Sequence, residues 1–293
     1  MVSRLYPTVR SGEKTHMTYK FFSVISGNAI TQEIDAAKIV HKTLPLRIMY
    51  SYLYLRNFKE FDNPEFLETY LDSGAYSQIN DKGDYPFSME EYVEYANKHH
   101  FTHVATLDYP CDERFISELS IKDRIGRTVE NTVNLIDQVP NLCAVIQGFT
   151  QSEYLDCIDQ YNDQGALTSN VGIGSICIRK KTSEIVPLVK AIKRNLPGET
   201  KIHCYGLEIP SIKKLYPYIT SSDSHTWGQC LHIGGRVLFF DGNKLRSFPR
   251  NKLDIMAGTT TCLHNYNLYL NHITRERNGL HNYSIKETKK RTP

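Results

Sequence analysis

Eight short apolar runs recur along the chain, and each is followed by a turn or polar cluster and then by a segment of helical periodicity. Several are apolar nearly throughout and rich in β-branched or aromatic residues, which is typical of strands buried on both faces of a parallel sheet. The runs are residues 21–25, 46–50, 66–71, 103–107, 142–146, 170–173, 201–205 and 218–222. Eight strands alternating with helices favour a (β/α)8 barrel. An open doubly wound sheet is the alternative, but no Gly-x-Gly-x-x-Gly follows the first run.

The segments between the runs carry helix start and stop signals. Ser88 and Glu91 have the spacing of a capping box and predict a helix that ends near residue 99. A second helix is expected to open at Thr128, and Ser152 is the expected N-cap of a third. Between residue 99 and the end of the barrel, four helices are predicted, over residues 128–136, 151–161, 183–196 and 211–216.

After residue 225 the alternation stops. Residues 234–243 read as a hairpin with an Asp241-Gly242 turn, and residues 262–277 read as a last helix. We therefore predict a barrel over residues 1–228, an appended hairpin-and-helix subdomain over 229–285, and a basic tail over 286–293. A chain of 293 residues is long enough for one such barrel or for two ordinary domains.

Composition sets the class of protein. With 40% apolar residues and 17 glycines the chain is neither disordered nor collagen-like. A net charge of +3 excludes a protein that coats nucleic acid, although a local basic patch can still contact phosphates. The seven cysteines lie singly, with no Cys-x-x-Cys, and no apolar run approaches the length of a membrane span. We expect a soluble cytoplasmic protein with reduced thiols and no membrane partner.

Polar residues follow the predicted strands where a (β/α)8 barrel has its active site, at the carboxyl ends. These residues are Asp72, Asp108, Gln147, the pair Gly174-Ser175, and Asp223. An Asp can accept hydrogen bonds from N1 and N2 of a guanine-like base, and a Gln amide can donate one to O6. A third carboxylate is then available to attack a sugar carbon. The set predicts a site for a planar base attached to a sugar.

The same segments resemble the motifs of the tRNA-guanine transglycosylases, in family order and one at each strand end. The six segments are Asp72-Ser-Gly-Ala-Tyr76, Leu107-Asp-Tyr-Pro110, Val145-Ile-Gln-Gly148, Ile173-Gly-Ser-Ile176, His203-Cys-Tyr-Gly206 followed by Pro210, and Asp223-Ser224. Two of them depart from the usual pattern, because Ala75 and Ser175 stand where the family often has glycine.

The resemblance implies a role for each matching residue. Asp223 would be the nucleophile at the sugar C1′, and Asp72 the general acid and base. Asp108 and Gln147 would bind the edge of the base. The remaining substrate-binding residues would be Ser73, Tyr76, which stacks on the base, and Gly174 and Ser175, which offer backbone groups.

The zinc site of the bacterial family members is not reproduced here, because Ala257 and Thr259 replace two of its cysteines. The reaction itself is expected to need neither ATP nor another cofactor. A zinc ion on substitute ligands is the open alternative, since structural zinc needs four ligands and several candidates are present. These candidates are Cys230, His232, Cys262, His264 and His281.

The substrate expectation comes from the same resemblance. We expect no RNA-binding domain like that of the archaeal tRNA enzymes after residue 285. The chain is therefore most similar to the DNA-guanine transglycosylases of phages and of bacterial DNA-modification clusters, which implies a role in restriction evasion. The expected partners are DNA and a free 7-deazaguanine base such as 7-cyano-7-deazaguanine. The basic stretches 179–181, 213–214 and 286–291 are candidates for contacts with phosphates, and a solvated surface is the equal alternative.

Three alternatives stay open: a tRNA-guanine transglycosylase, a barrel hydrolase that uses the same carboxylates on a glycoside or nucleoside, and a non-catalytic partner subunit. Asp72 and Asp223 are both present, which favours an active enzyme. The sequence also leaves a homodimer open.

Overall fold

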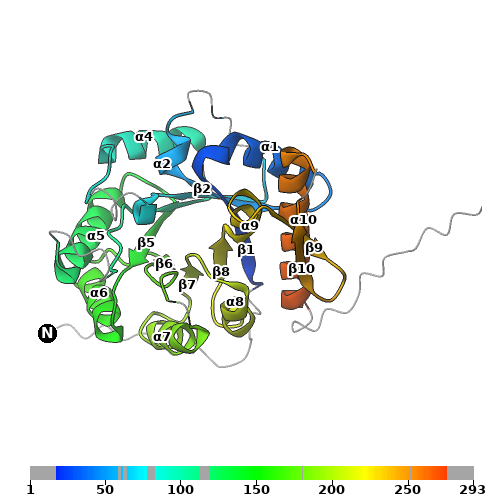
Figure 1. Cartoon of the computed structure of the whole chain (residues 1–293). Helices are drawn as coiled ribbons and strands as arrows, with labels where there is room; N and C mark the ends of the chain where they lie inside the picture. Colours follow the sequence, from blue (N-terminus) through cyan, green and yellow to red (C-terminus); the bar gives the residue numbers. More distant parts are fainter. Residues whose placement is uncertain are drawn as a thin grey trace, which may run out of the picture.

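The computed structural model describes residues 18–58, 61, 65–77, 83–112, 119–179, 181–250 and 253–275. Within them, eight parallel strands close into a barrel in which each strand pairs with its neighbours in sequence and the last pairs with the first (Figure 1). The strands are β1 (Lys20–Ile25), β2 (Arg47–Ser51), β3 (Glu68–Asp72), β4 (His103–Ala105), β5 (Leu142–Ile146), β6 (Asn170–Ile173), β7 (Lys201–Cys204) and β8 (Ser221–Ser224). The predicted (β/α)8 fold is confirmed.

The barrel strands are buried on both faces, as their apolar runs predict. All five residues of β5 are buried. Alternate side chains such as Met49 and Tyr70 form a small cluster of their own within the barrel. Their neighbours Ile48 and Leu71 belong instead to the larger core under the helices.

Helices surround the barrel (Figure 1). They are α1 (Ile30–His41), α2 (Tyr52–Leu55), α4 (Met89–His99), α5 (Ile121–Leu135), α6 (Gln151–Asp163), α7 (Thr182–Arg194), α8 (Ile209–Leu215), α9 (Thr226–His232) and α10 (Ile255–Arg275), and a 3-10 turn, η1 (Gly27–Ala29), precedes α1. The helices α1, α2 and α9 are additions to the sequence prediction. The helix α2 is too short to show a helical period in the sequence.

Helix starts are set by capping boxes, and two of them correct the prediction. The box of Ser88 and Glu91 is present at the start of α4. The helix α5 begins at Ile121 and not at Thr128, because Ser120 and the third residue of the helix, Asp123, cap each other. The cap of α6 is Thr150, and not Ser152, since its side chain accepts from the backbone N–H of residue 153.

The last barrel strand lies further along the chain than predicted. The apolar residues from 218 onward favour a strand over 218–222, but β8 comprises Ser221–Ser224. Tyr218 instead belongs to the turn after α8, where its backbone N–H donates to the carbonyl of Leu215. A buried strand of sequence Ser-Ser-Asp-Ser carries no hydrophobic signal. Asp223 therefore lies within the strand and not after it.

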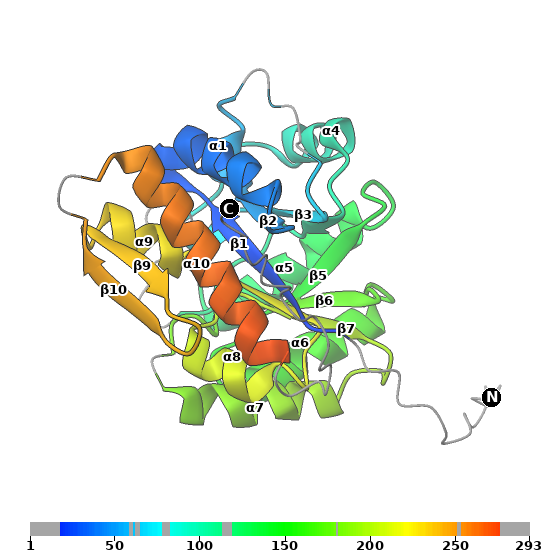
Figure 2. The ribbon, with the colours of Figure 1, turned by 90° about the vertical axis from the view of Figure 1, so that its right-hand side faces the viewer.

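The chain beyond the barrel forms the predicted hairpin and a longer helix than predicted. The hairpin strands are β9 (Arg236–Phe240) and β10 (Leu245–Pro249). The helix α10 begins at Ile255 and not at Cys262, because the Asp254 carboxylate accepts from the backbone N–H groups of Met256 and Ala257. Figure 2 shows α10 lying lengthwise beside β1 and α1, with the hairpin outside it. Residues 276–293, which include His281 and the predicted tail, lie outside the described residues.

None of the helices in the described ranges is both long and apolar enough to cross a lipid bilayer.

Candidate active site

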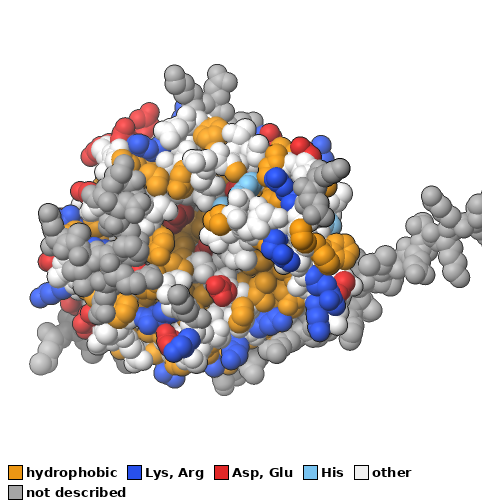
Figure 3. Space-filling view, in the orientation of Figure 1, with side chains coloured by type: hydrophobic (Ala, Val, Ile, Leu, Met, Phe, Trp, Pro, Cys, Tyr) orange, Lys and Arg blue, Asp and Glu red, His pale blue; other side chains and the backbone are white. Residues whose placement is uncertain are grey.

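A cavity of about 410 Å³ opens at the carboxyl ends of the barrel strands. Figure 3 looks into the hollow, where acidic side chains are visible below the surface. Its lining includes seven of the eight residues predicted for the site, namely Asp72, Tyr76, Asp108, Gln147, Gly174, Ser175 and Asp223. The eighth, Ser73, is fully buried behind Asp108. Residues from five different strand ends therefore meet in one pocket.

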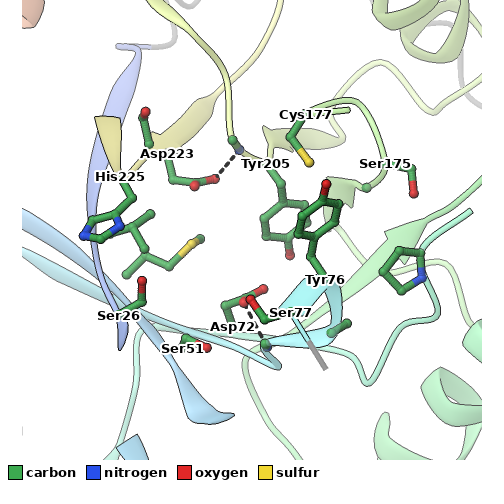
Figure 4. Close-up of a pocket in the computed structure, with 18 of the residues that line it drawn as sticks. Ser26, Ser51, Asp72, Tyr76, Ser77, Ser175, Cys177, Tyr205, Asp223 and His225 are labelled. Carbon is green, nitrogen blue, oxygen red and sulfur yellow. Dashed lines mark hydrogen bonds between the residues drawn. The ribbon is translucent and has the colours of Figure 1, made fainter. Parts of the chain in front are cut away.

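The Asp223 carboxylate is held from two sides. Its Oδ1 accepts from the backbone N–H of Gly206 at 3.0 Å (Figure 4). The same oxygen lies 3.0 Å from Nε2 of His203. Burial lowers the pKa of His203, against the opposing effect of Asp223, so the imidazole is neutral at neutral pH. A neutral imidazole beside a carboxylate donates through Nε2, and its Nδ1 then accepts from the hydroxyl of Ser221, 2.9 Å away.

The carboxyl groups of Asp72 and Asp223 project into the same pocket from different sides (Figure 4). Oδ2 of Asp72 accepts from the backbone N–H of Gly74 at 2.9 Å. Burial raises the pKa of Asp72 to about 7, and the nearby carboxylates of Asp108 and Asp223 act in the same direction, against the hydrogen bond from Gly74. A carboxyl group that titrates near neutrality can both donate and accept a proton during a reaction.

Both oxygens of Asp108 accept hydrogen bonds within the protein. The hydroxyl of Ser73 donates to Oδ1 at 3.0 Å, and the amide nitrogen of Gln147 donates to Oδ2 at 2.5 Å. Burial raises the pKa of Asp108 to about 6, although these two hydrogen bonds oppose the shift. The pair presents acceptor oxygens and an amide at the pocket wall, as the edge of a guanine-like base requires.

Two glycines of β6 and the segment after it make room for this arrangement. A Cβ at Gly174 would stand 2.2 Å from Nε2 of Gln147, so a larger residue would displace the amide. A Cβ at Gly172 would meet the ring of Tyr205, whose hydroxyl lies 2.8 Å from that of Tyr70. Tyr76, predicted to stack on the base, stands at the rim with 43% of its surface exposed.

Several residues in the pocket or behind its wall escape sequence reasoning. His203 belongs to a recognised motif, but only the structure shows that it contacts Asp223. His225 lines the pocket, and its Nε2 lies 2.8 Å from Oε1 of the fully buried Glu33. A second histidine, His232, approaches the same oxygen at 3.3 Å. Glu33 lies in α1, 192 residues from His225, so no local pattern could have paired them.

The described residues among those considered for zinc are Cys230, His232, Cys262 and His264. No group of three or more His, Cys, Asp or Glu side chains placed to hold a metal ion occurs within the described part of the chain. His232 faces Glu33, and the thiol of Cys262 accepts from the backbone N–H of Leu238. Cys230 is partly buried.

The basic stretches predicted to contact phosphates are partly engaged within the protein. The Arg179 guanidinium donates to the carbonyl of Phe149 and lies over the ring of the same residue. Lys181 pairs with Glu184 at 3.7 Å. The ammonium group of Lys213 lies over the ring of Tyr269, in α10.

Comparison with known proteins identifies the family of the chain. None of the curated proteins compared matches the chain. A family model does match, over residues 55–232, which is well over half of the chain and runs from the end of α2 to the end of α9. This stretch contains all eight predicted site residues. The chain therefore belongs to the family DpdA, DeoxyPurine in DNA protein A, a DNA-guanine transglycosylase family related to tRNA-guanine transglycosylase.

Proposed function

We propose that this protein exchanges guanine in DNA for a free 7-deazaguanine base through a covalent intermediate on Asp223. Membership of the family supports a transglycosylase that acts on DNA. The observation that carries the finer proposal is the contrast between two carboxyl groups in one pocket. Asp223 is fixed by two hydrogen-bond donors, whereas burial raises the pKa of Asp72 to about 7. The first suits a nucleophile and the second a proton carrier.

In the first step, a carboxylate oxygen of Asp223 forms a bond to C1′ of the deoxyribose while the bond from C1′ to N9 of guanine breaks. The leaving base carries the electron pair of that bond and takes a proton from the neutral carboxyl of Asp72. The sugar is then an ester of Asp223, and Asp72 is ionised.

In the second step, the incoming 7-deazaguanine gives the proton of its ring N–H to Asp72. That nitrogen attacks C1′, and the carboxylate of Asp223 leaves. Each protonation state is restored, and two displacements return the original configuration at C1′. One glycosidic bond replaces another of similar energy, so the exchange needs neither ATP nor a redox cofactor.

Asp108 and Gln147 would recognise the base. The carboxylate of Asp108 can accept from N1–H and the 2-amino group of guanine, and a side-chain N–H of Gln147 can donate to O6. A 7-deazaguanine presents this same edge. The backbone of the Gly174-Ser175 turn and the ring of Tyr76 would complete the base site.

The target nucleotide must leave the DNA helix for Asp223 to reach C1′. A base within a duplex is stacked, so enzymes that act on it use single strands or rotate the nucleotide out of the helix. A cavity of about 410 Å³ has the size of a small-molecule site and is open to the surface at the barrel mouth (Figure 3). We expect single-stranded or mismatched guanine to react faster than paired guanine.

The test is incorporation of radiolabelled guanine, or of 7-cyano-7-deazaguanine followed by mass spectrometry, into a DNA oligonucleotide. We expect incorporation into DNA, none into tRNA, and none with D223N. A covalent adduct between wild-type protein and DNA should survive denaturation and disappear in D223N. Incorporation into tRNA alone would refute DNA as the substrate. Release of guanine without incorporation of a new base would identify a hydrolase.

A further inference from the structure

Ser175 holds a backbone conformation that residues with a Cβ seldom adopt. Its φ angle is 55°, and among the described residues the other non-glycine with positive φ is His100, at the end of α4. Glycine would occupy the left-handed region without strain. A serine persists at such a position only when its surroundings hold it there. What holds it is a pair of hydrogen bonds made by its hydroxyl.

The direction of these hydrogen bonds follows from the groups that make them. The backbone N–H of Cys111 donates to Oγ of Ser175 at 2.8 Å, and an N–H can only donate. The hydroxyl hydrogen is therefore free for the contact of 2.6 Å with Gln147. It needs an acceptor, so the atom of Gln147 that faces Ser175 is the oxygen Oε1.

The contact made by the amide nitrogen of Gln147 supports the same orientation of the amide. Nε2 of Gln147 faces Oδ2 of Asp108, and an ionised carboxylate only accepts. A reversed amide would bring its oxygen against the carboxylate, which is repulsive. Gln147 is 1% exposed, so the loss of either partner would leave a buried polar group unpaired, which is costly. The amide is thus fixed with its N–H side toward Asp108 and its oxygen toward Ser175.

We propose that the Ser175 hydroxyl is a positioning residue that fixes the Gln147 amide and thereby makes the site select 6-oxo purines over 6-amino purines. The inference rests on the proposed base site. With the amide held, the group that meets position 6 of the base is an N–H donor, which pairs with a carbonyl oxygen and clashes with an amino group. To accept a 6-amino base, the amide would have to rotate and lose both of its partners.

Two variants distinguish the effect of losing the Ser175 hydroxyl from the effect of relieving its backbone strain. S175A and S175G both lack the hydroxyl, but only S175G relieves the positive φ. We expect both to bind guanine about 10-fold more weakly, as the loss of one buried hydrogen bond predicts. We expect the ratio of guanine to adenine affinity to fall about 10-fold in both. S175G should nevertheless unfold at a higher temperature than S175A. The exposed Ser152 supplies a matched control, S152A.

Equilibrium binding of radiolabelled guanine and adenine to the purified protein is the main measurement, with base exchange measured in parallel. In exchange, the KM for the free base should rise in both variants while kcat changes less than about threefold. The inference fails if either variant keeps the wild-type ratio, or if S175G regains the selectivity that S175A loses. Absence of exchange in a wild-type protein that selects guanine would overturn the proposed function and leave this inference standing. A wild-type protein that selects neither base would overturn the inference.

Discussion

Nε2 of His203 lies 3.0 Å from Oδ1 of Asp223, and both side chains are buried. His203 is in turn anchored by the hydroxyl of Ser221, two residues before Asp223 on the same strand. The neutral imidazole therefore acts as a fixed donor that orients the carboxylate without neutralising it. A carboxylate whose oxygen is held by this hydrogen bond keeps its position when the sugar binds.

Replacement of His203 should impair the chemical step more than binding. We expect H203A to lower kcat for base exchange about 10- to 100-fold with little change in the KM for the free base. The reason is that a small displacement of a nucleophile lowers the rate of the chemical step by about this factor. H203Q, whose amide can still donate, should retain more activity. Steady-state kinetics of both variants provide the measurement. A variant with normal kcat and raised KM would show that His203 contacts substrate and does not position Asp223.

Asp72 should lower stability at alkaline pH while serving catalysis. Burial raises the pKa of Asp72 to about 7, whereas an unfolded aspartate titrates near its ordinary value of about 3.9. Between these values the folded state binds the extra proton, so stability falls as pH rises through this window. We expect D72N to abolish exchange and to unfold at a higher temperature than wild type at pH 8.

The difference in unfolding temperature between D72N and wild type should shrink as pH falls toward 4, where Asp72 is protonated in the folded protein. Thermal unfolding of both proteins at several pH values would reveal this convergence. An equal difference at pH 5 and pH 8 would contradict the raised pKa, because both states would then titrate alike. D163N, at the exposed end of α6, offers a carboxyl control.

Gly174 should be required for base binding. A Cβ there would stand 2.2 Å from Nε2 of Gln147, so G174A must displace the amide from Asp108. We expect the KM for the base to rise at least about 10-fold, from loss of a hydrogen bond to a charged group. G198A adds the same methyl group where no atom lies within 4 Å and should leave exchange unchanged. An active G174A with normal KM would remove Gln147 from the base site.

Two glycine substitutions should change stability in opposite directions. A Cβ at Gly228 would lie 2.3 Å from Nε2 of His225 and 2.8 Å from Oε1 of Glu33, so G228A should destabilise the fold by about 1–3 kcal/mol. Gly126 lies within α5 with open space around it, so G126A should stabilise the fold by up to about 1 kcal/mol. Denaturant unfolding would measure both free energies. A stabilised G228A would show that the Glu33 and His225 pair readily moves aside.

The barrel and most of its rim were predictable because their signals are local. Asp72, Asp108 and Gln147 each directly follow an apolar run. The rule for parallel barrels therefore places all three at one mouth. Strand β8 was misplaced because its Ser-Ser-Asp-Ser sequence depends on the rest of the barrel for burial. Asp223 was nevertheless found, since a motif depends on residue identity and not on hydrophobicity.

What escaped prediction depends on contacts between distant segments. The contact of Glu33 with His225 joins residues that no sequence period connects. The hydroxyl of Ser73 was expected at the base and instead donates to Asp108 from behind. The sequence predicts that Ser175 offers backbone groups to the base, but it does not predict what its hydroxyl contacts. Its hydrogen bonds to Cys111 and Gln147 join three separate strand ends, which meet only once the barrel has closed.

The position of α10 has a consequence for how the protein is made. This last described helix packs on β1 and α1 near the other end of the chain, and the amide of Asn267 donates to Ser23 across 244 residues (Figure 2). A ribosome releases β1 long before it releases α10. During that interval the outer face of the first strand lacks its cover, and exposed apolar surface of this kind promotes aggregation. The first strand therefore stays uncovered until α10 has been synthesised and has packed on it.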